Sequence, residues 1–145
     1  MRILLTLLFV FTSLNFAMAN EVFIDNDDQT ITDVVTGLTW QKAKPSTPLS
    51  FPAALQACTN LELGGHRDWR LPEVKELLSI VDFKRYDPAI NTLYFPSTSG
   101  LYWMQTSDNG SVKRRILKTR YGSISEIIEM GNPYYNAVLN FRCVR

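Results

Sequence analysis

Two short stretches of the sequence hold the residue types best suited to chemistry, GGHRDWRLP at residues 64–72 and SVKRRILKTRYG at residues 111–122. The first contains the only histidine, His66, two residues before Asp68, and a histidine beside a carboxylate can do general acid–base work. The second carries five positive charges and no acid, and the planar donors of arginine suit sulfate, phosphate or carboxylate. The first pattern would therefore transfer protons, whereas the second would bind anions.

Proton transfer at His66 lacks a partner, because no serine or cysteine nucleophile lies beside it in the sequence. In an extended segment His66, Asp68 and Arg70 share one face, while Trp69 points to the other. We therefore interpret this stretch as scaffold, with Trp69 as a core anchor and with Asp68 and Arg70 pairing with neighbouring groups. The protein is predicted not to be an enzyme and to need no cofactor.

Anion binding at residues 111–122 is the stronger functional hypothesis. On a strand, Arg114, Lys118 and Arg120 share one face, and Lys113 and Arg115 lie on the other. Such a strip concentrates positive potential that could hold an acidic polysaccharide, the phosphate of a lipopolysaccharide or an acidic protein. The alternative is an ordinary solvated strand whose charges are balanced by nearby acids.

Two loops add further candidates. Tyr134 and Tyr135 follow Gly-Asn-Pro, and exposed rings there could stack on sugars or form a protein interface. The acidic run at residues 25–29 offers alternating oxygens of the kind that calcium prefers, but it lacks the glycine and the distant glutamate of an EF-hand. We interpret that run as a hairpin turn without a metal, and a calcium site is the alternative.

Alternating and helical hydrophobic patterns indicate the elements that must position these residues. Strands are predicted at 23–24, 30–32 and 38–41, the last containing Trp40. A first helix, capped by Ser50, runs through residues 54–61 towards Gly64-Gly65, and a second has Pro72 in its first turn and runs to residue 81. After an irregular connection over 86–100, strands are predicted at 102–106 with Trp103, at 112–121 and at 137–144. This order predicts a single α+β domain.

The first 19 residues predict export. Arg2 precedes an apolar run at residues 3–11, and small residues flank Met18, which is the pattern of a signal peptide cleaved after Ala19. The apolar run is too short to span a bilayer, so we expect no membrane span after cleavage. Residues 20–145 would form the domain, in the periplasm or outside the cell. Without Arg2 this part is formally neutral, so its total charge predicts no partner.

An exported chain meets oxidising surroundings, where its two cysteines, Cys58 and Cys143, most simply form a disulfide. The alternative is two free thiols in catalysis, although neither has a histidine beside it. Zinc is disfavoured, since one histidine and two cysteines cannot complete a four-ligand site without a carboxylate.

Several fragments occur in an order that resembles one family. They are TITDVVTGLTWQK, AALQAC, GGHRDWRLPEVKELLSIVD, a Phe95-Pro96 loop, YWMQTS and the terminal NFRCVR. Together they resemble the Lcl C-terminal domain family, long carried as a domain of unknown function and named for the end domain of a bacterial collagen-like adhesin. The resemblance covers essentially all of the chain after the first 19 residues.

The resemblance implies a C-type-lectin-like fold: two helices packed on a twisted antiparallel sheet, long irregular loops, and a cysteine of the first helix bridged to the last strand. It also implies export, and in the adhesin the domain is associated with binding sulfated polysaccharides. The Glu-Pro-Asn and Trp-Asn-Asp motifs of calcium-dependent sugar-binding lectins do not occur here. Formylglycine-generating enzymes share a related fold, but they need active-site cysteines that a disulfide would consume.

From these observations we expect a non-enzymatic binding module that recognises an anionic polysaccharide or another surface component. The alternative is a structural or assembly subunit of an envelope complex or surface appendage that binds a protein partner. Nucleic acid is a poor candidate for an exported protein. The sequence does not predict an oligomeric state.

Overall fold

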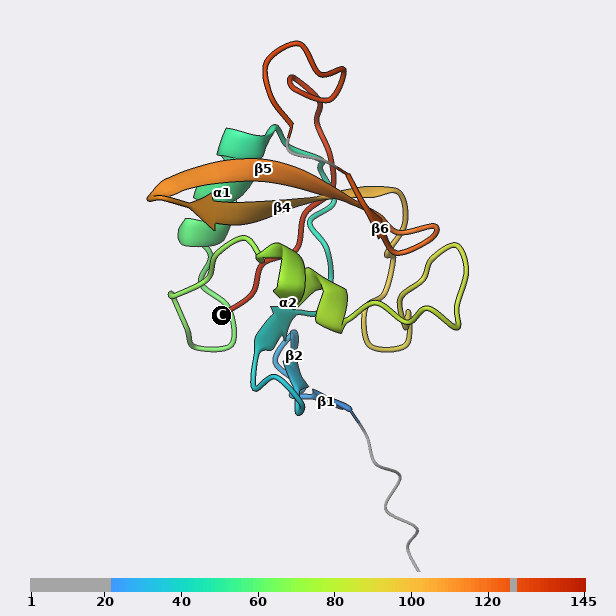
Figure 1. Cartoon of the computed structure of the whole chain (residues 1–145). Helices are drawn as coiled ribbons and strands as arrows, with labels where there is room; N and C mark the ends of the chain where they lie inside the picture. Colours follow the sequence, from blue (N-terminus) through green and yellow to red (C-terminus); the bar gives the residue numbers. More distant parts are fainter. Residues whose placement is uncertain (1–21, 126–127) are drawn as a thin grey trace, which may run out of the picture.

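The computed structural model describes residues 22–125 and 128–145 and has an α+β architecture (Figure 1). Two antiparallel sheets of three strands each and two short helices make up its regular structure. In chain order the elements are β1 (Phe23–Asp25), β2 (Thr30–Asp33), β3 (Thr39–Gln41), α1 (Phe51–Thr59), α2 (Val74–Ser79), β4 (Leu101–Asp108), β5 (Ser111–Lys118) and β6 (Ser123–Ile124). The predicted α+β class is therefore confirmed.

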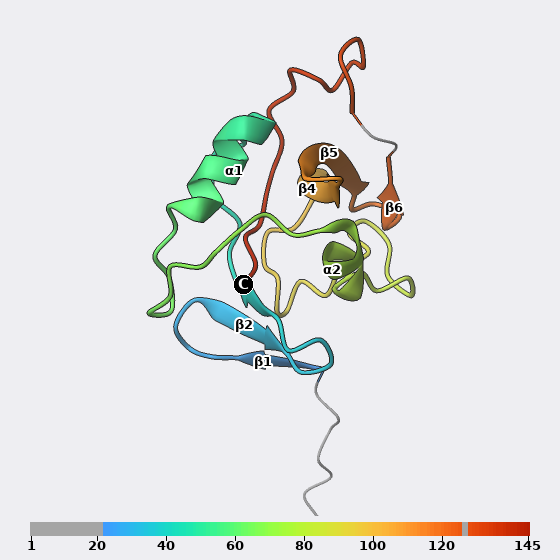
Figure 2. The same cartoon turned by 60° about the vertical axis from the view of Figure 1, so that its left-hand side comes forward.

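The long β4–β5 hairpin is the centre of the domain. Trp103 pairs with Ile116, and the neighbouring pair is Tyr102 with Leu117. Because successive side chains of a strand point to opposite faces, these two pairs lie on opposite sides of the sheet. All four side chains are buried, so the hairpin is covered on both sides. Figure 2 shows α1 and α2 on different sides of this hairpin.

The core consists of two clusters, one on each side of the hairpin. The first contains Trp40 from β3 and Leu77 from α2, together with Tyr102. The second contains Phe51 from α1 and Trp69, together with Trp103. Both predicted tryptophan anchors of the strands, Trp40 and Trp103, are fully buried. The two helices therefore pack on opposite faces of one hairpin, not side by side on a single sheet.

The C-terminal segment differs from its prediction. A regular strand was expected over residues 137–144, but the segment is extended and forms only isolated bridges, because it passes between elements that do not belong to one sheet. Its partners are Leu49 for Leu139, Tyr102 for Asn140, and both Trp40 and Arg70 for Val144. This segment therefore joins β3, the 64–72 loop and β4.

Both helices are shorter than their hydrophobic patterns predict. The helix α1 ends at Thr59, before the two glycines, and its N-cap Ser50 makes no side-chain capping bond. The helix α2 starts at Val74 with Glu73 as its N-cap, so Pro72 precedes the first turn. The carbonyl of Pro72 instead accepts a hydrogen bond from the Gln105 N–H of β4 at 2.9 Å, which keeps this residue outside the helix.

Within residues 22–125 and 128–145, no helix is long and apolar enough to cross a membrane. The predicted signal peptide, residues 1–19, lies outside the described residues.

Candidate binding site

The loop around His66 is closed by hydrogen bonds that serve the fold. The Trp69 side chain is buried, and its indole N–H lies 3.2 Å from the carbonyl oxygens of both Leu63 and His66. Asp68 accepts a hydrogen bond from the Arg145 guanidinium at 2.8 Å, which lowers the pKa of its carboxyl. These contacts are those of the scaffold that we expected from the sequence.

Arg70 is the second structural residue of this loop. Its guanidinium donates to both carboxylate oxygens of Glu76, at 2.6 and 2.7 Å. The same carboxylate accepts the backbone N–H of Glu73 at 2.8 Å and so completes the capping box of α2. The ion pair therefore attaches the loop to the start of α2, and it lowers the pKa of Glu76.

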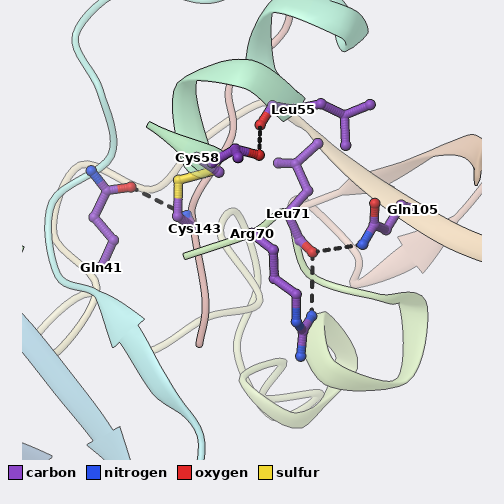
Figure 3. The surroundings of a disulfide bond; sticks show 8 residues. Gln41, Leu55, Cys58, Arg70, Leu71, Gln105 and Cys143 are labelled. Carbon is purple, nitrogen blue, oxygen red and sulfur yellow. Dashed lines mark hydrogen bonds between the residues drawn. A yellow bond between two sulfur atoms is a disulfide. The ribbon is translucent and has the colours of Figure 1, made fainter. Parts of the chain in front are cut away.

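The disulfide between Cys58 and Cys143 joins α1 to the C-terminal segment (Figure 3). Beside it, the backbone N–H of Cys143 donates to the side-chain oxygen of Gln41 at 3.2 Å. Both cysteines are buried, and the predicted pairing is confirmed. Since the sequence has no other cysteine, no thiol is left for catalysis or for a metal.

The five basic residues of the 111–122 stretch do not form one strip. Arg114 is half-buried: its guanidinium carbon lies 4.1 Å from the centre of the Tyr135 ring and 5.5 Å from that of Phe51. Arg115 lies on the other face of β5 and donates to the carbonyl of Ser125 at 3.2 Å. Both guanidinium groups bond to other parts of the protein, so fewer of their N–H donors are left for a ligand.

Lys113 lies towards the tip of the hairpin, opposite Thr106, and its ammonium is 3.3 Å from the Asp108 carboxylate. Lys118 lies at the other end of β5, opposite Leu101, and is exposed. Among residues 22–125 and 128–145, Lys118 takes part in no ion pair. The two lysines therefore lie towards opposite ends of β5.

Lys118 and Arg120 line a groove of about 340 Å³ at the open end of the hairpin. Its other lining residues are Asp87, Gly100, Leu101 and Tyr121. Arg120 is 3.0 Å from the Asp87 carboxylate, so these two charges balance each other and Lys118 gives the groove its excess positive charge. This groove is the place where the predicted basic residues are most accessible.

Aromatic side chains continue from this groove. The rings of Tyr86 and Tyr121 meet edge to face, with their centres 5.5 Å apart. The Tyr86 hydroxyl is hydrogen-bonded to that of Tyr121, which raises the pKa of Tyr86 and lowers that of Tyr121. Phe83 lies beside Gly122, where its ring would be 3.1 Å from an added Cβ. All three rings are exposed to solvent.

The sequence model of the Lcl C-terminal domain matches residues 29–145, which is most of the chain. The chain belongs to the Lcl C-terminal domain family. No curated protein and no solved structure gives a significant match. The resemblance seen in the sequence fragments is thus confirmed.

Tyr134 and Tyr135 of this Lcl C-terminal domain are less exposed than a sugar-stacking loop requires. Both are half-buried and pack against the second core cluster. The carbonyl of Tyr135 also accepts a hydrogen bond from Arg114 at 2.8 Å. Their first role is therefore to attach the 128–138 loop to the domain.

The acidic turn at residues 25–29 uses its oxygens internally. Asp28 accepts hydrogen bonds from the backbone N–H and the hydroxyl of Thr30, and Asp25 is paired with Lys42. In the described part of this Lcl C-terminal domain, no group of three or more histidine, cysteine or acidic side chains could hold a metal ion.

Sequence reasoning missed the exposed rings of Phe83, Tyr86 and Tyr121. A signal was present in DFKRYD at residues 82–87, where aromatic and basic residues follow α2 without its helical spacing. Residues that keep no core periodicity but are large and aromatic are candidates for an exposed surface. Only the fold, however, shows that this segment lies against residues 118–122.

Proposed function

We propose that this Lcl C-terminal domain is a non-enzymatic binding module that recognises an anionic polysaccharide through the groove at Lys118 and Arg120. The observation that carries the proposal is the position of these two exposed cations on one groove next to Tyr121. Cations at a surface attract sulfate, phosphate and carboxylate groups over about a Debye length, roughly 8 Å at physiological salt. Arg114 and Arg115 contribute less, because their guanidinium groups donate to backbone carbonyls of the protein, and Lys113 lies towards the tip of the hairpin, away from the groove.

We also propose that the protein is not an enzyme, because the groups that could assist His66 in catalysis are already bonded to other residues. Asp68 is paired with Arg145, and both cysteines form the disulfide. His66 therefore has neither an acid that is available to orient it nor a thiol to activate. A hydrolase assay on the ligand that binds is the direct test, and release of shorter chains would contradict this part of the proposal.

We further propose that the chain is exported, with cleavage after Ala19, and that it works in the periplasm or outside the cell. The disulfide supports this location, because such bonds persist in oxidising compartments. We also propose that the two sheets and two helices are a form of the C-type-lectin-like fold. Sequencing the N-terminus of the secreted protein tests the first point, and an experimental structure tests the second.

The test of binding measures the affinity of the protein for sulfated, phosphorylated and neutral polysaccharides across a salt series, with calcium and with a chelator. We expect binding to be confined to the anionic polymers, to weaken with salt and to survive the chelator. Binding to none of the polymers would overturn the proposal. Salt-resistant capture of an envelope protein would instead favour the alternative role as an assembly subunit.

Paired substitutions at the end of β5 and in the turn that follows it test whether the groove is the binding site. Lys118→Gln combined with Arg120→Gln is expected to weaken binding about threefold to tenfold, since exposed charge pairs each contribute roughly 0.2–1 kcal/mol. Lys113→Gln, near the tip of the same hairpin, is the matched control and is expected to have little effect. Equal losses from both changes would show that the whole basic stretch binds, and not the groove.

A further inference from the structure

Three exposed aromatic rings gather beside the groove. The exposed fractions are 73% for Phe83, 65% for Tyr86 and 57% for Tyr121. Large rings exposed singly are common, but three that come from two adjoining segments form the kind of surface that marks an interaction site. The chemistry around Phe83, Tyr86 and Tyr121 indicates what kind of ligand fits these rings.

The rings come from two segments that are held together by backbone hydrogen bonds. The N–H of Asp87 donates to the carbonyl of Arg120 at 3.1 Å, and the N–H of Ala89 donates to Thr119 at 2.7 Å. Figure 1 shows the 82–89 segment, in yellow-green, beside the connection from β5 to β6. The group is therefore built on a paired backbone, which fixes where the rings lie.

Gly122 lets the two segments approach closely. Its φ is +65°, and an added Cβ would lie 2.5 Å from a methyl carbon of Val81 and 3.1 Å from the ring of Phe83. A side chain at this position would displace Val81 and Phe83. The position of Phe83 beside residue 122, which follows Tyr121 in the chain, thus depends on a glycine there.

The arrangement leaves ring faces open. In an edge-to-face pair, the edge of one ring covers one face of the other, so most ring faces of Tyr86 and Tyr121 are not covered by the pair itself. The face of an aromatic ring is negative and attracts polarised C–H groups. The apolar face of a pyranose ring presents such C–H groups.

Cations border the same surface. Tyr121 lines the groove with Lys118 and Arg120, and the ring of Tyr86 adjoins that of Tyr121, so the tyrosine pair borders the positive charges. A purely apolar partner would leave the ammonium of Lys118 without a counterpart, and a polyanion without sugar rings would leave the aromatic rings without a contact. A sugar ring that carries an anionic substituent satisfies both.

We propose that Phe83, Tyr86 and Tyr121 form a platform on which a pyranose ring stacks while its anionic substituent contacts Lys118 and Arg120. This inference rests on the proposed function and narrows it, because it assigns to the module a preference for anionic sugar chains over polyanions without sugar rings. Phe83 and Tyr86 are binding residues outside the basic strand.

The test compares two polymers with the same charged group, dextran sulfate and poly(vinyl sulfate), of which only the first has sugar rings. Phe83→Ala and Tyr86→Ala are each expected to weaken binding of dextran sulfate about threefold to tenfold, on the scale of an aromatic contact. Binding of poly(vinyl sulfate) is expected to stay within about twofold. Tyr86→Phe, which keeps the ring, is expected to preserve the preference for dextran sulfate.

Val35→Ala is the matched control, because Val35 is also an exposed apolar residue, 77% exposed, but lies in the turn after β2. Far-ultraviolet circular dichroism and a melting curve show whether each variant is folded. Unchanged binding in the two alanine variants, or equal losses for both polymers, would overturn the platform alone. If the unaltered protein bound neither polymer, the proposed function would fail together with it.

Discussion

The guanidinium of Arg114 lies over the ring of Tyr135, 4.1 Å from the ring centre, and donates a hydrogen bond to the carbonyl of the same residue at 2.8 Å. The two contacts attach the 128–138 loop to β5. A ring, a carbonyl and the nearby Phe51 already surround this cation. Arg114 is therefore first a residue of the fold, although its charge suggests a ligand.

Arg114→Gln is expected to lower the free energy of unfolding by about 1–3 kcal/mol, because it removes a cation–π contact and a charge-assisted hydrogen bond from a half-buried site. Lys118→Gln on the same strand is expected to change it by less than about 0.5 kcal/mol, since that side chain is exposed. Urea unfolding of both variants measures the difference. Equal stabilities would show that Arg114 is as dispensable to the fold as Lys118.

Features of the fold for which the residues leave few structural alternatives could be predicted from the sequence. The two cysteines had only each other as disulfide partners, and Trp69 points to the face opposite the polar residues of its segment, so the disulfide and the core anchor were both expected. The acidic turn and the β4–β5 hairpin are also as predicted. For the turn and the hairpin, neighbouring residues along the chain carry the decisive information, and for the disulfide it is the presence of only two cysteines in the sequence.

The parts that could not be predicted depend on contacts between distant segments. Arg114 and Arg115 alternate on β5 as expected, but only tertiary packing shows that both faces of the hairpin are covered. The pairing of Tyr86 with Tyr121 joins residues 35 positions apart in the sequence. The predicted start of α2 was wrong because the carbonyl of Pro72 accepts a hydrogen bond from β4, a partner that helical spacing does not reveal.

Removal of the disulfide is expected to have the largest effect on stability of the changes considered. Cys58 and Cys143 are 85 residues apart, and the chain-entropy relation gives about 4–5 kcal/mol for a loop of that length. The double substitution Cys58→Ala and Cys143→Ala should therefore lower the urea midpoint strongly, and a reducing agent should do the same to the unaltered protein. A urea midpoint that stays the same after reduction would show that packing alone holds α1 to the C-terminal segment.

Arg142 is the buried cation of the RCVR ending. Its guanidinium donates to the carbonyls of Gln41 and Lys42 and, at 2.9 Å, to the Thr98 hydroxyl. Burial lowers its pKa to about 10, which leaves it charged at neutral pH. Arg142→Lys keeps the charge but loses the planar donor set, so we expect roughly 1–3 kcal/mol of destabilisation by urea unfolding.

If Arg142→Lys were as stable as the unaltered protein, the charge alone would matter at this position and the geometry of the guanidinium would not. Arg145→Lys is the matched control, since Arg145 is the other arginine of the same ending and makes an ion pair with the exposed Asp68. It is expected to cost less than about 1 kcal/mol, as exposed pairs do.

The Arg70–Glu76 pair is expected to make the stability of the protein depend on pH in the acid range. The hydrogen bonds from Arg70 lower the pKa of Glu76 in the folded protein below its ordinary value of 4.5. The unfolded chain therefore binds this proton first, so the pair stabilises the protein above pH 4.5 and its contribution is lost as the pH falls through the lowered pKa. Glu76→Gln removes this titration and still offers an oxygen to the N–H of Glu73.

The variant is accordingly expected to be less stable than the unaltered protein at pH 7, and the difference should shrink as the pH falls below 4.5. Asp25 and Asp68, whose pKa values are also lowered, remain in both proteins and give a common background slope. Urea unfolding at several pH values between 7 and 3 yields the two curves. Parallel curves would mean that Glu76 titrates alike in the folded and unfolded chains, and that its bonds to Arg70 do not stabilise the start of α2.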